Sequence, residues 1–410
     1  MDSARTGARA PVGGWPTLTT FDLLGDDHRE PSGTPLLRPF PGLRYVPDVA
    51  GPLDRLLAPP HTELDKTRRS AFLASSPYVV THLERPEYGG GSTSPLVLDW
   101  LDRGVLLQDP ASFYVVRQPG VSSGAHLGVR HFLLGTLTVT PDDPRVHPHE
   151  GVFEQAVVAR LQRLEDTRVD SEPVLVVDSD PWPVPWTQPG PLGQHVAGSG
   201  ESGVDVWRLR DPEVVGALAE ASRTHRFLIA DGHHRYAAAV LAAHRNGQPQ
   251  DLLVAVASQP VEPVDLRALH RIVPVRAAQA VLDAATRRRR LVVADPSVLS
   301  RVQASLGADQ AVVVQSSGAE VVEGPPADGA SGAGAFVDAA IRSGGTPSDL
   351  VQYQGDLDVA LEAVGSHAAV LLPRPTVEGL NRLVRAGGLM GRKTTSFRPK
   401  PLAGTVLRLR

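Results

Sequence analysis

The stretch 227–240, FLIADGHHRYAAAV, constrains this chain more than any other. Four apolar residues run into Asp231 and Gly232, and an alanine-rich segment follows. This pattern predicts a buried strand, a tight turn and a helix. Asp231 stands where a helix N-cap would stand, and Gly232 lets the backbone come close to a ligand.

The first turn of the predicted helix carries His233, His234 and Arg235. A helix start presents unpaired N–H groups and the positive end of the helix dipole, so basic residues there disfavour the helix but favour a bound anion. The pattern therefore predicts a phosphate site. The structural alternative is two histidines satisfied by the protein and an arginine paired with a surface carboxylate. Zinc on these two histidines alone is not expected, because neighbouring helical positions point about 100° apart.

Composition limits the remaining possibilities. A chain of 410 residues suits two or three domains, and its 41% hydrophobic content supports a packed core. The net charge of −4 argues against a nucleic-acid partner, and the absence of cysteine excludes thiolate chemistry. We see no apolar run of membrane-spanning length and no signal segment, so we expect a cytoplasmic protein without a membrane partner. The oligomeric state stays open.

Local patterns divide the chain into four parts. Residues 1–34, rich in Gly, Pro, Ser and Thr, predict a flexible extension. Residues 35–145 predict an N-terminal mixed α/β domain, and 146–280 a middle domain with a Pro/Gly-rich insertion at 178–203. Residues 281–410 predict a C-terminal α/β domain. We therefore expect an α+β protein.

Three shorter segments give local predictions. Asp211 followed by Pro212 predicts a helix start, because aspartate caps and proline suits the first helical position. Residues 78–83 predict a strand. The basic run 287–290 predicts a solvated helix face without a function.

A second set of candidate functional residues is His147, His149 and Glu150. In an extended segment the two histidines would share one face and Glu150 would face away. A histidine pair separated by one residue can bind metal, but a solvent-exposed turn explains the same pattern. Glu150 would serve as a base if it lay near the turn that carries His233.

A third set is the loop 392–396, RKTTS, which follows a glycine and combines two cations with three hydroxyls. Lys393, Thr394 and Thr395 suit an oxyanion there, although a solvated loop has the same composition. No Walker A sequence, dinucleotide fingerprint or nucleophile elbow is present in the sequence.

From about Leu37 onward the chain resembles the bacterial and archaeal family catalogued as domain of unknown function 1015. The resemblance rests on the order and spacing of these segments: Arg38-Pro39-Phe40, Gly42-Leu43-Arg44-Tyr45, Ala58-Pro59-Pro60, Ser76-Pro77-Tyr78, Pro148-His149-Glu150, Asp231-Gly232-His233-His234-Arg235-Tyr236, Lys393-Thr394-Thr395, Phe397 and Pro399-Lys400.

The middle part is similar to the ADP-dependent free serine kinases of the ParB/sulfiredoxin superfamily. The resemblance implies a ParB/sulfiredoxin-like middle domain flanked by N- and C-terminal α/β domains. It implies that Glu150, with His149 beside it, acts as base on a substrate hydroxyl. It also implies phosphate contacts from Gly232, His233, His234 and Arg235, with Asp231 orienting a histidine or assisting Mg²⁺.

Two departures from the family pattern bear on the substrate. The family usually continues Ala-Pro-Pro with Tyr-Asp, where this chain has His61 and Thr62, and its Met-Pro is Met390-Gly391 here. We assign Arg44, Tyr45 and His61 to substrate binding on this resemblance, so the substrate itself is open.

The resulting expectation is a kinase that transfers phosphate from ADP or ATP, with Mg²⁺, to the hydroxyl of serine or a serine-like metabolite. One alternative is a metal-dependent phosphoester hydrolase that uses His147, His149 and His233. Another is a non-catalytic nucleotide sensor. Bound metal would separate the hydrolase from the kinase, and turnover would separate the sensor from both.

Overall fold

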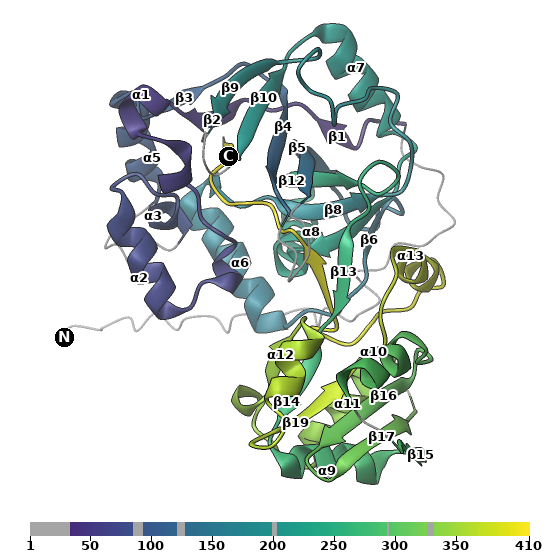
Figure 1. Ribbon diagram of the computed structural model, residues 1–410. Helices are drawn as coiled ribbons and strands as arrows, with labels where there is room; N and C mark the ends of the chain where they lie inside the picture. The colour runs from purple at the N-terminus through teal and green to yellow at the C-terminus, as the bar shows by residue number, and fades with distance from the viewer. Residues whose placement is uncertain (1–32, 85–92, 121–127, 199–202, 293–294, 326–331) are drawn as a thin grey trace, which may run out of the picture.

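The computed structural model describes residues 33–84, 93–120, 128–198, 203–292, 295–325 and 332–410. Apart from its last two residues, the expected extension 1–34 lies outside these ranges. The protein is a mixed α/β structure with a large body and a smaller domain below it (Figure 1). Within the described residues, no helix is long and apolar enough to cross a membrane.

The body is built on one sheet of nine strands. The order is β6-β11-β8-β12-β5-β4-β10-β9, and β1 pairs with β5 at the side. Their bounds are β1 Leu37–Arg38, β4 Phe113–Pro119, β5 Val129–Val139, β6 Val146–Pro148, β8 Val174–Asp178, β9 Gln194–Gly198, β10 Asp205–Leu209, β11 Phe227–Asp231 and β12 Gln250–Ser258.

The central strands bury both of their faces, which is why they read as continuous apolar runs. In β12, Leu253 and Ala255 enter one hydrophobic core, while Leu252 and Val254 enter another on the opposite face. This alternation is the two-residue period of a strand. The sheet therefore holds its strand ends in fixed positions between two packed layers.

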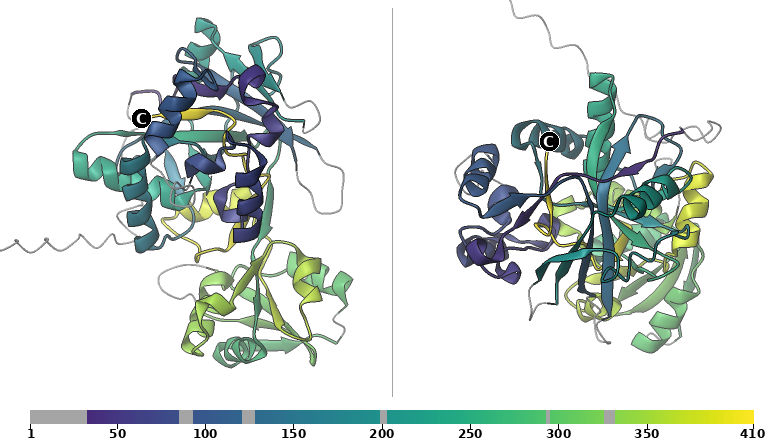
Figure 2. Two further views of the ribbon diagram at one scale, coloured as in Figure 1. Left: turned by 90° about the vertical axis from the view of Figure 1, so that its left-hand side faces the viewer. Right: turned by 90° about the horizontal axis from the view of Figure 1, so that it is seen from above.

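Helices and a second sheet cover the faces of the large sheet (Figures 1 and 2). The second sheet has the order β3-β2-β21-β7, with β2 Gly42–Tyr45, β3 Leu106–Gln108, β7 Val169–Asp170 and β21 Leu407–Leu409. The helices of the body are α1 Pro47–Ala50, α2 Lys66–Ser75, α3 Thr81–Glu84, α5 Thr93–Asp102, α6 Glu154–Thr167, α7 Pro212–Ala221, α8 His233–Asn246 and α13 Val377–Arg385.

The C-terminal domain has its own sheet, ordered β15-β17-β16-β19-β14-β18. Its strands are β14 His270–Val273, β15 Arg287–Arg290, β16 Gln310–Gln315, β17 Gly318–Glu323, β18 Gln352–Gln354 and β19 Ala368–Leu371, and its helices are α9 Val275–Ala284, α10 Pro296–Ala304, α11 Ala333–Ser343 and α12 Leu357–Glu362. A two-stranded ribbon of β13 (Asp265–Ala268) and β20 (Thr395–Arg398) joins this domain to the body.

The observed units differ from the predicted ones. We expected 35–145 and 146–280 to fold separately, but β4 and β5 from the first part pair with β10 and β12 from the second in one sheet. The C-terminal domain begins at β14, before residue 281, and the chain leaves it again to reach β21 in the body. Strand pairing between distant segments decides these boundaries, and no local pattern reports it.

Two of the three local predictions were wrong. Residues 78–83 end in the short helix α3 rather than forming a strand. Residues 287–290 form β15, an edge strand with all four arginines exposed, rather than a helix. Charged side chains on an edge strand oppose pairing with another chain. The third was confirmed, because the Asp211 side chain accepts hydrogen bonds from the N–H groups of Glu213 and Val214 at the start of α7.

Candidate functional site

The turn between β11 and α8 has the predicted strand–turn–helix form. The N-cap is Gly232 and not Asp231 as predicted, because Asp231 still belongs to β11 and its side chain caps no N–H of the helix. Gly232 has φ +91°, a left-handed conformation that favours glycine. A Cβ on this residue would lie 2.9 Å from Nη2 of Arg235 and 3.0 Å from Cγ2 of Val174. Glycine is therefore required by both conformation and space, and it leads directly into the 14-residue helix.

The sheet brings His149 and Glu150 to this turn. Strand β6 runs parallel to β11, with Pro148 opposite Ile229, so the residues that follow β6 lie at the end of β11. The ring of His149 packs edge-on against the ring of His233, with centroids 4.6 Å apart. Two segments more than eighty residues apart in the sequence thus form one cluster.

Hydrogen bonds assign the proton positions on His149. Its Nδ1 lies 2.7 Å from the carbonyl oxygen of Ile229, which only accepts, so Nδ1 carries the proton. The same Nδ1 lies 3.2 Å from Nε2 of His233. Burial lowers the pKa of His149 to about 4, so the ring is neutral and its Nε2 accepts from the hydroxyl of Thr395 at 2.7 Å.

Glu150 is held by the predicted loop that follows Gly391. The N–H of Lys393 donates to its Oε1 at 2.5 Å, and the N–H of Thr394 donates to its Oε2 at 3.2 Å. The hydroxyl of Thr395 lies 3.4 Å from Oε2. The loop therefore binds a carboxylate of the protein itself through its backbone, and leaves the Lys393 side chain over the ring of Tyr353, 4.8 Å from the centroid.

The environment of Glu150 suits a proton acceptor. Burial raises its pKa to about 7, although the N–H groups of Lys393 and Thr394 and the charge of Arg271 lower it in part. A carboxyl with a pKa near neutrality exchanges a proton readily at the pH of a cell. Thr395 lies between Glu150 and His149, and its hydroxyl, which donates to His149, can accept a hydrogen bond from Glu150 when that carboxyl is protonated.

The two histidines of the helix start are neutral. Burial, followed by the neighbouring His149, lowers the pKa of His233 well below its usual value. Burial and then the charges of Arg160, Arg392 and Lys393 lower the pKa of His234. His234 Nε2 accepts the N–H of Phe153 at 3.0 Å, so the neutral ring carries its proton on Nδ1. The positive field at the helix start therefore comes from the helix and from these three cations.

An aromatic platform stands beside the helix start. The ring of Phe153 is stacked with that of His234, with planes 2° apart, and Arg392 lies over the Phe153 ring at 4.4 Å. Phe153 is the residue before α6, and its side chain is 45% exposed. The ring of Phe153 therefore links His234 at the helix start to the cation of Arg392.

Arg235 is engaged by the protein. Its Nη1 donates to the carbonyl oxygens of Glu172 and of Pro173, and its Nη2 lies 3.0 Å from a carboxylate oxygen of Glu172 and 3.3 Å from one of Asp231. Burial alone would raise the pKa of Glu172. The charge of Arg235, and then the contact with His61, outweigh burial and hold this pKa well below its usual value. The guanidinium thus ties the turn to the segment before β8.

Asp231 is also shared between two cations. Lys400 Nζ lies 2.7 Å from its Oδ1, opposite the contact with Arg235. Burial lowers the pKa of Lys400, but the charge of Asp231 outweighs this, and the net shift is upward. Asp231 therefore orients the turn through Lys400 and Arg235, and a metal ion would compete with both for its oxygens.

We expect Arg235→Lys to lower the free energy of unfolding by about 1.5–3 kcal/mol, because lysine has no planar fork to reach two carbonyls and two carboxylates. Urea unfolding measures this, with Arg245→Lys, an exposed residue at the other end of α8, as the matched control. Equal stability of the two variants would contradict the structural role of Arg235.

The three N-terminal residues assigned to substrate binding differ in their placement. Tyr45 is 1% exposed in the core, with its hydroxyl donating to the carbonyl of Tyr78, so it cannot touch a substrate. Arg44 pairs with Asp109 at 3.0 Å. His61 Nδ1 lies 2.7 Å from Glu172, which places it behind Arg235. Only His61 of the three is connected to the turn.

Arg271 is a functional neighbour that the sequence reasoning missed. Its side chain is fully buried, pairs with Asp338 at 2.8 Å and donates to the carbonyl oxygens of Lys393 and Arg392. It therefore fixes the loop that holds Glu150. The signal in the sequence is a charged residue inside the apolar strand β14, since a buried charge needs partners.

The described ranges contain one set of three side chains that suits a metal ion. Asp178, Asp180 and His225 bring their ligand atoms within 4.8 Å of one another. Asp178 pairs with Phe227, at the opposite end of β11 from Asp231, so this set is separate from the cluster around Glu150. Within the same ranges, His147, His149 and His233 form no such set.

Comparison with solved structures finds weak likenesses. A free serine kinase mutant in complex with ADP is 14% identical with a TM-score of 0.40, over 66% of this chain and 91% of that one. A conserved hypothetical protein from Pyrococcus furiosus is 12% identical with a TM-score of 0.38, over 67% and 93%. SbnI from Staphylococcus aureus is 10% identical with a TM-score of 0.35, over 64% and 82%.

No curated protein matches the chain. One family model does, and it covers residues 37–294, well over half of the sequence. These residues include the large sheet, Glu150 and the turn at Gly232. The chain therefore belongs to the family described as protein of unknown function (DUF1015).

Proposed function

We propose that this protein is a nucleotide-dependent kinase that transfers a phosphoryl group from ADP or ATP to the hydroxyl of serine or a serine-like metabolite. The observation that carries the proposal is the position of Glu150. Its carboxyl has a pKa raised to about 7 and lies next to His149, whose ring contacts His233 in the first turn of α8. This arrangement supports the proposal, because a base and an anion site would lie side by side.

The helix start supplies groups that fit the phosphates of a nucleotide. The N–H groups of His233 and His234 have no recorded acceptor within the described part of the chain, as expected at the first turn of a helix. Arg160, Arg392 and Lys393 lie close enough to lower the pKa of His234. Gly232, His233 and His234 would hold the phosphates, and Arg235 would stand behind them.

A magnesium ion would be held mainly by the phosphates themselves. Mg²⁺ in kinases takes one or two carboxylates together with phosphate oxygens. Asp231 is the carboxylate of this turn, and its oxygens are shared with Lys400 and Arg235. The ion would neutralise charge on the transferred group, and the residues of the chain would position the reactants.

Glu150 would remove the proton of the acceptor hydroxyl. The oxygen of that hydroxyl would attack the terminal phosphorus of the nucleotide at the same time. The shortened nucleotide leaves, and Glu150 keeps the proton until it passes to solvent. Thr394 and Lys393 hold the carboxyl in place through their N–H groups. Such positioning and charge neutralisation are what phosphoryl transfer requires, without a covalent intermediate.

The rate should depend on pH through Glu150. A base works in its ionised form, so kcat/KM should fall about tenfold for each pH unit below 7 and level off above it. Initial rates with serine held well below its KM, measured between pH 5.5 and 8.5, test this. A flat profile over the same range would contradict the role of Glu150 as the base.

The geometry favours the kinase over the two alternatives. Both ring nitrogens of His149 are engaged, by Ile229 and by Thr395, so this residue is not free to bind the metal of a hydrolase. A nucleotide sensor would need the anion site at α8 but no ionisable carboxyl near neutrality beside it. The raised pKa of Glu150 therefore favours transfer.

A further inference from the structure

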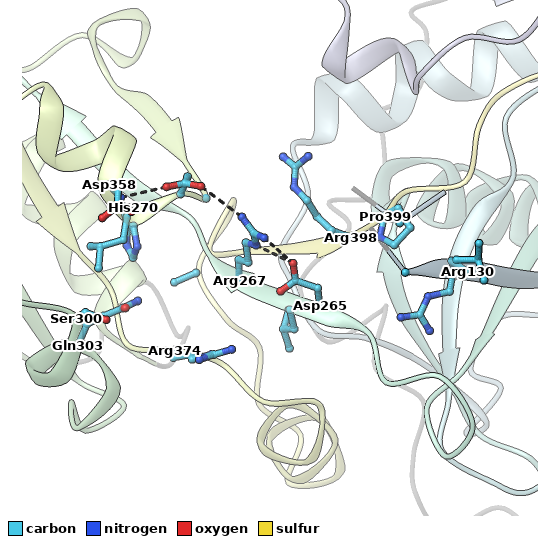
Figure 3. Close-up of a pocket in the computed structure, with 18 residues that line it drawn as sticks. Arg130, Asp265, Arg267, His270, Ser300, Gln303, Asp358, Arg374, Arg398 and Pro399 are labelled. Carbon is cyan, nitrogen blue, oxygen red and sulfur yellow. Dashed lines mark hydrogen bonds and ion pairs between the residues drawn. The ribbon is translucent and has the colours of Figure 1, made fainter. Parts of the chain in front are cut away.

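A cavity of about 630 Å³ lies where the C-terminal domain meets the body. Figure 3 shows side chains from both units around it. The residues of its lining that matter below are Arg267, His270, Ser300, Asp358, Arg374 and Arg398. The volume is in the usual range of sites for small metabolites.

The charges of the cavity are unevenly matched. Arg267 is satisfied by Asp265 at 2.8 Å and by Asp356 at 3.7 Å. Arg374 has no recorded carboxylate partner within the described residues, and the contact recorded for Arg398 is Glu63 at 4.0 Å. The Arg374 guanidinium is thus available to an anion, and a bidentate arginine contact is the usual way to bind carboxylate or phosphate.

A buried donor adds a second, independent observation. His270 lines the cavity although it is only 2% exposed, and its Nδ1 accepts the N–H of Leu372 at 3.1 Å. Burial, and next the charge of Arg271, lowers its pKa to about 4, so the ring is neutral and Nε2 carries the proton. No acceptor for this Nε2–H is recorded in the described part of the chain. A ligand oxygen would satisfy it.

The ribbon β13–β20 forms the wall between this cavity and Glu150. Alternate residues of β20 point to opposite faces. Thr395 and Phe397 face His149, and the ring centroids of Phe397 and His149 are 5.7 Å apart. Arg398 lines the cavity instead. The cavity is therefore separate from the cluster around Glu150, but it shares a strand with it.

We propose that this cavity binds a small organic anion, with its carboxylate or phosphate at Arg374 and an oxygen on His270. Asp358 on the same wall accepts a hydroxyl or ammonium group of the same molecule. The inference does not depend on the proposed phosphoryl transfer, since no residue of the cavity takes part in that reaction.

Titration calorimetry on the full chain tests the site with three probes: inorganic phosphate, citrate and O-phospho-L-serine. We expect saturable binding of at least one probe, with one site per chain, and a higher unfolding temperature in its presence. Arg374→Ala should weaken this binding about ten- to a hundredfold, because a charge-assisted hydrogen bond is lost. Arg301→Ala is the matched control, an exposed arginine of α10 that does not line the cavity.

A second variant, with a negative charge added to the lining of the cavity, tests the same site without removing Arg374. Ser300 is exposed on α10 and lines the cavity, so Ser300→Asp should fold normally and weaken anion binding as strongly as Arg374→Ala. Binding that is equal in these two variants and in Arg301→Ala would place the anion elsewhere, for example at the helix start of α8. That result would overturn the inference. So would the absence of binding of every probe at about 10 mM.

Discussion

Replacing Glu150 by glutamine should lower kcat for phosphoryl transfer by about 10²–10⁴-fold, the usual contribution of a general base. The nucleotide KM should change little, because the phosphates lie at the start of α8 and not on this carboxyl. The step in the pH profile near 7 should disappear as well, since the group that produces it is gone. Steady-state kinetics with ADP or ATP and serine measures all three effects.

The control must separate chemistry from folding. Glutamine has one acceptor oxygen, so its amide nitrogen would face one of the two N–H groups of Lys393 and Thr394, at a cost of about 1–3 kcal/mol. Thermal unfolding shows how much of the variant is folded. Glu154→Gln, an exposed glutamate on the first turn of α6, should keep full activity. Retained turnover in a folded Glu150→Gln protein would rule out this base.

Removing the Arg271 guanidinium should be the most damaging change to stability. Arg271→Met leaves Asp338 and the carbonyl oxygens of Lys393 and Arg392 without their donor in a buried place. Breaking a buried ion pair in this way costs about 3–5 kcal/mol. The urea midpoint of the transition that unfolds the C-terminal domain should fall accordingly, and the loop that holds Glu150 should loosen with it.

Two further variants test the reason for this loss. Arg276→Met, an exposed arginine in α9, should leave the midpoint unchanged. Adding Asp338→Leu to Arg271→Met should restore part of the stability, because the unpaired carboxylate is then absent. A loss below about 1 kcal/mol for Arg271→Met would mean that this pair contributes no more than an exposed one.

Local chemistry predicted the parts of the fold that depend on neighbouring residues. The run into Asp231 and Gly232 predicted β11, the turn and α8, because a buried strand, a left-handed glycine and an alanine-rich helix each have a local cause. The predicted domain boundary at residue 145 is not observed, because β5 and β12, which are far apart in the sequence, pair in one sheet. The prediction of a helix at 287–290 was wrong, because pairing with β17, and not the local composition, makes this segment the strand β15.

The same division holds for the site. His149, Glu150, Thr394, Thr395 and His233 were all named from the sequence, and the structure brings them into one hydrogen-bonded cluster. The sequence did not reveal which groups are hydrogen-bonded to each other. The backbone of the loop binds Glu150 and not an outside anion. Arg235 donates to Glu172, a residue before β8 that no motif marked.

Phosphorus NMR of the protein with ADP or ATP, Mg²⁺ and a pool of hydroxy-amino acids tests the central claim most directly. The proposal predicts a new phosphomonoester resonance that grows as the terminal phosphate of the nucleotide declines. It also predicts that Glu150→Gln abolishes this growth over the same time course. Inorganic phosphate as the sole product would indicate a hydrolase, and an unchanged nucleotide spectrum with bound nucleotide would indicate a sensor; either result would contradict a kinase.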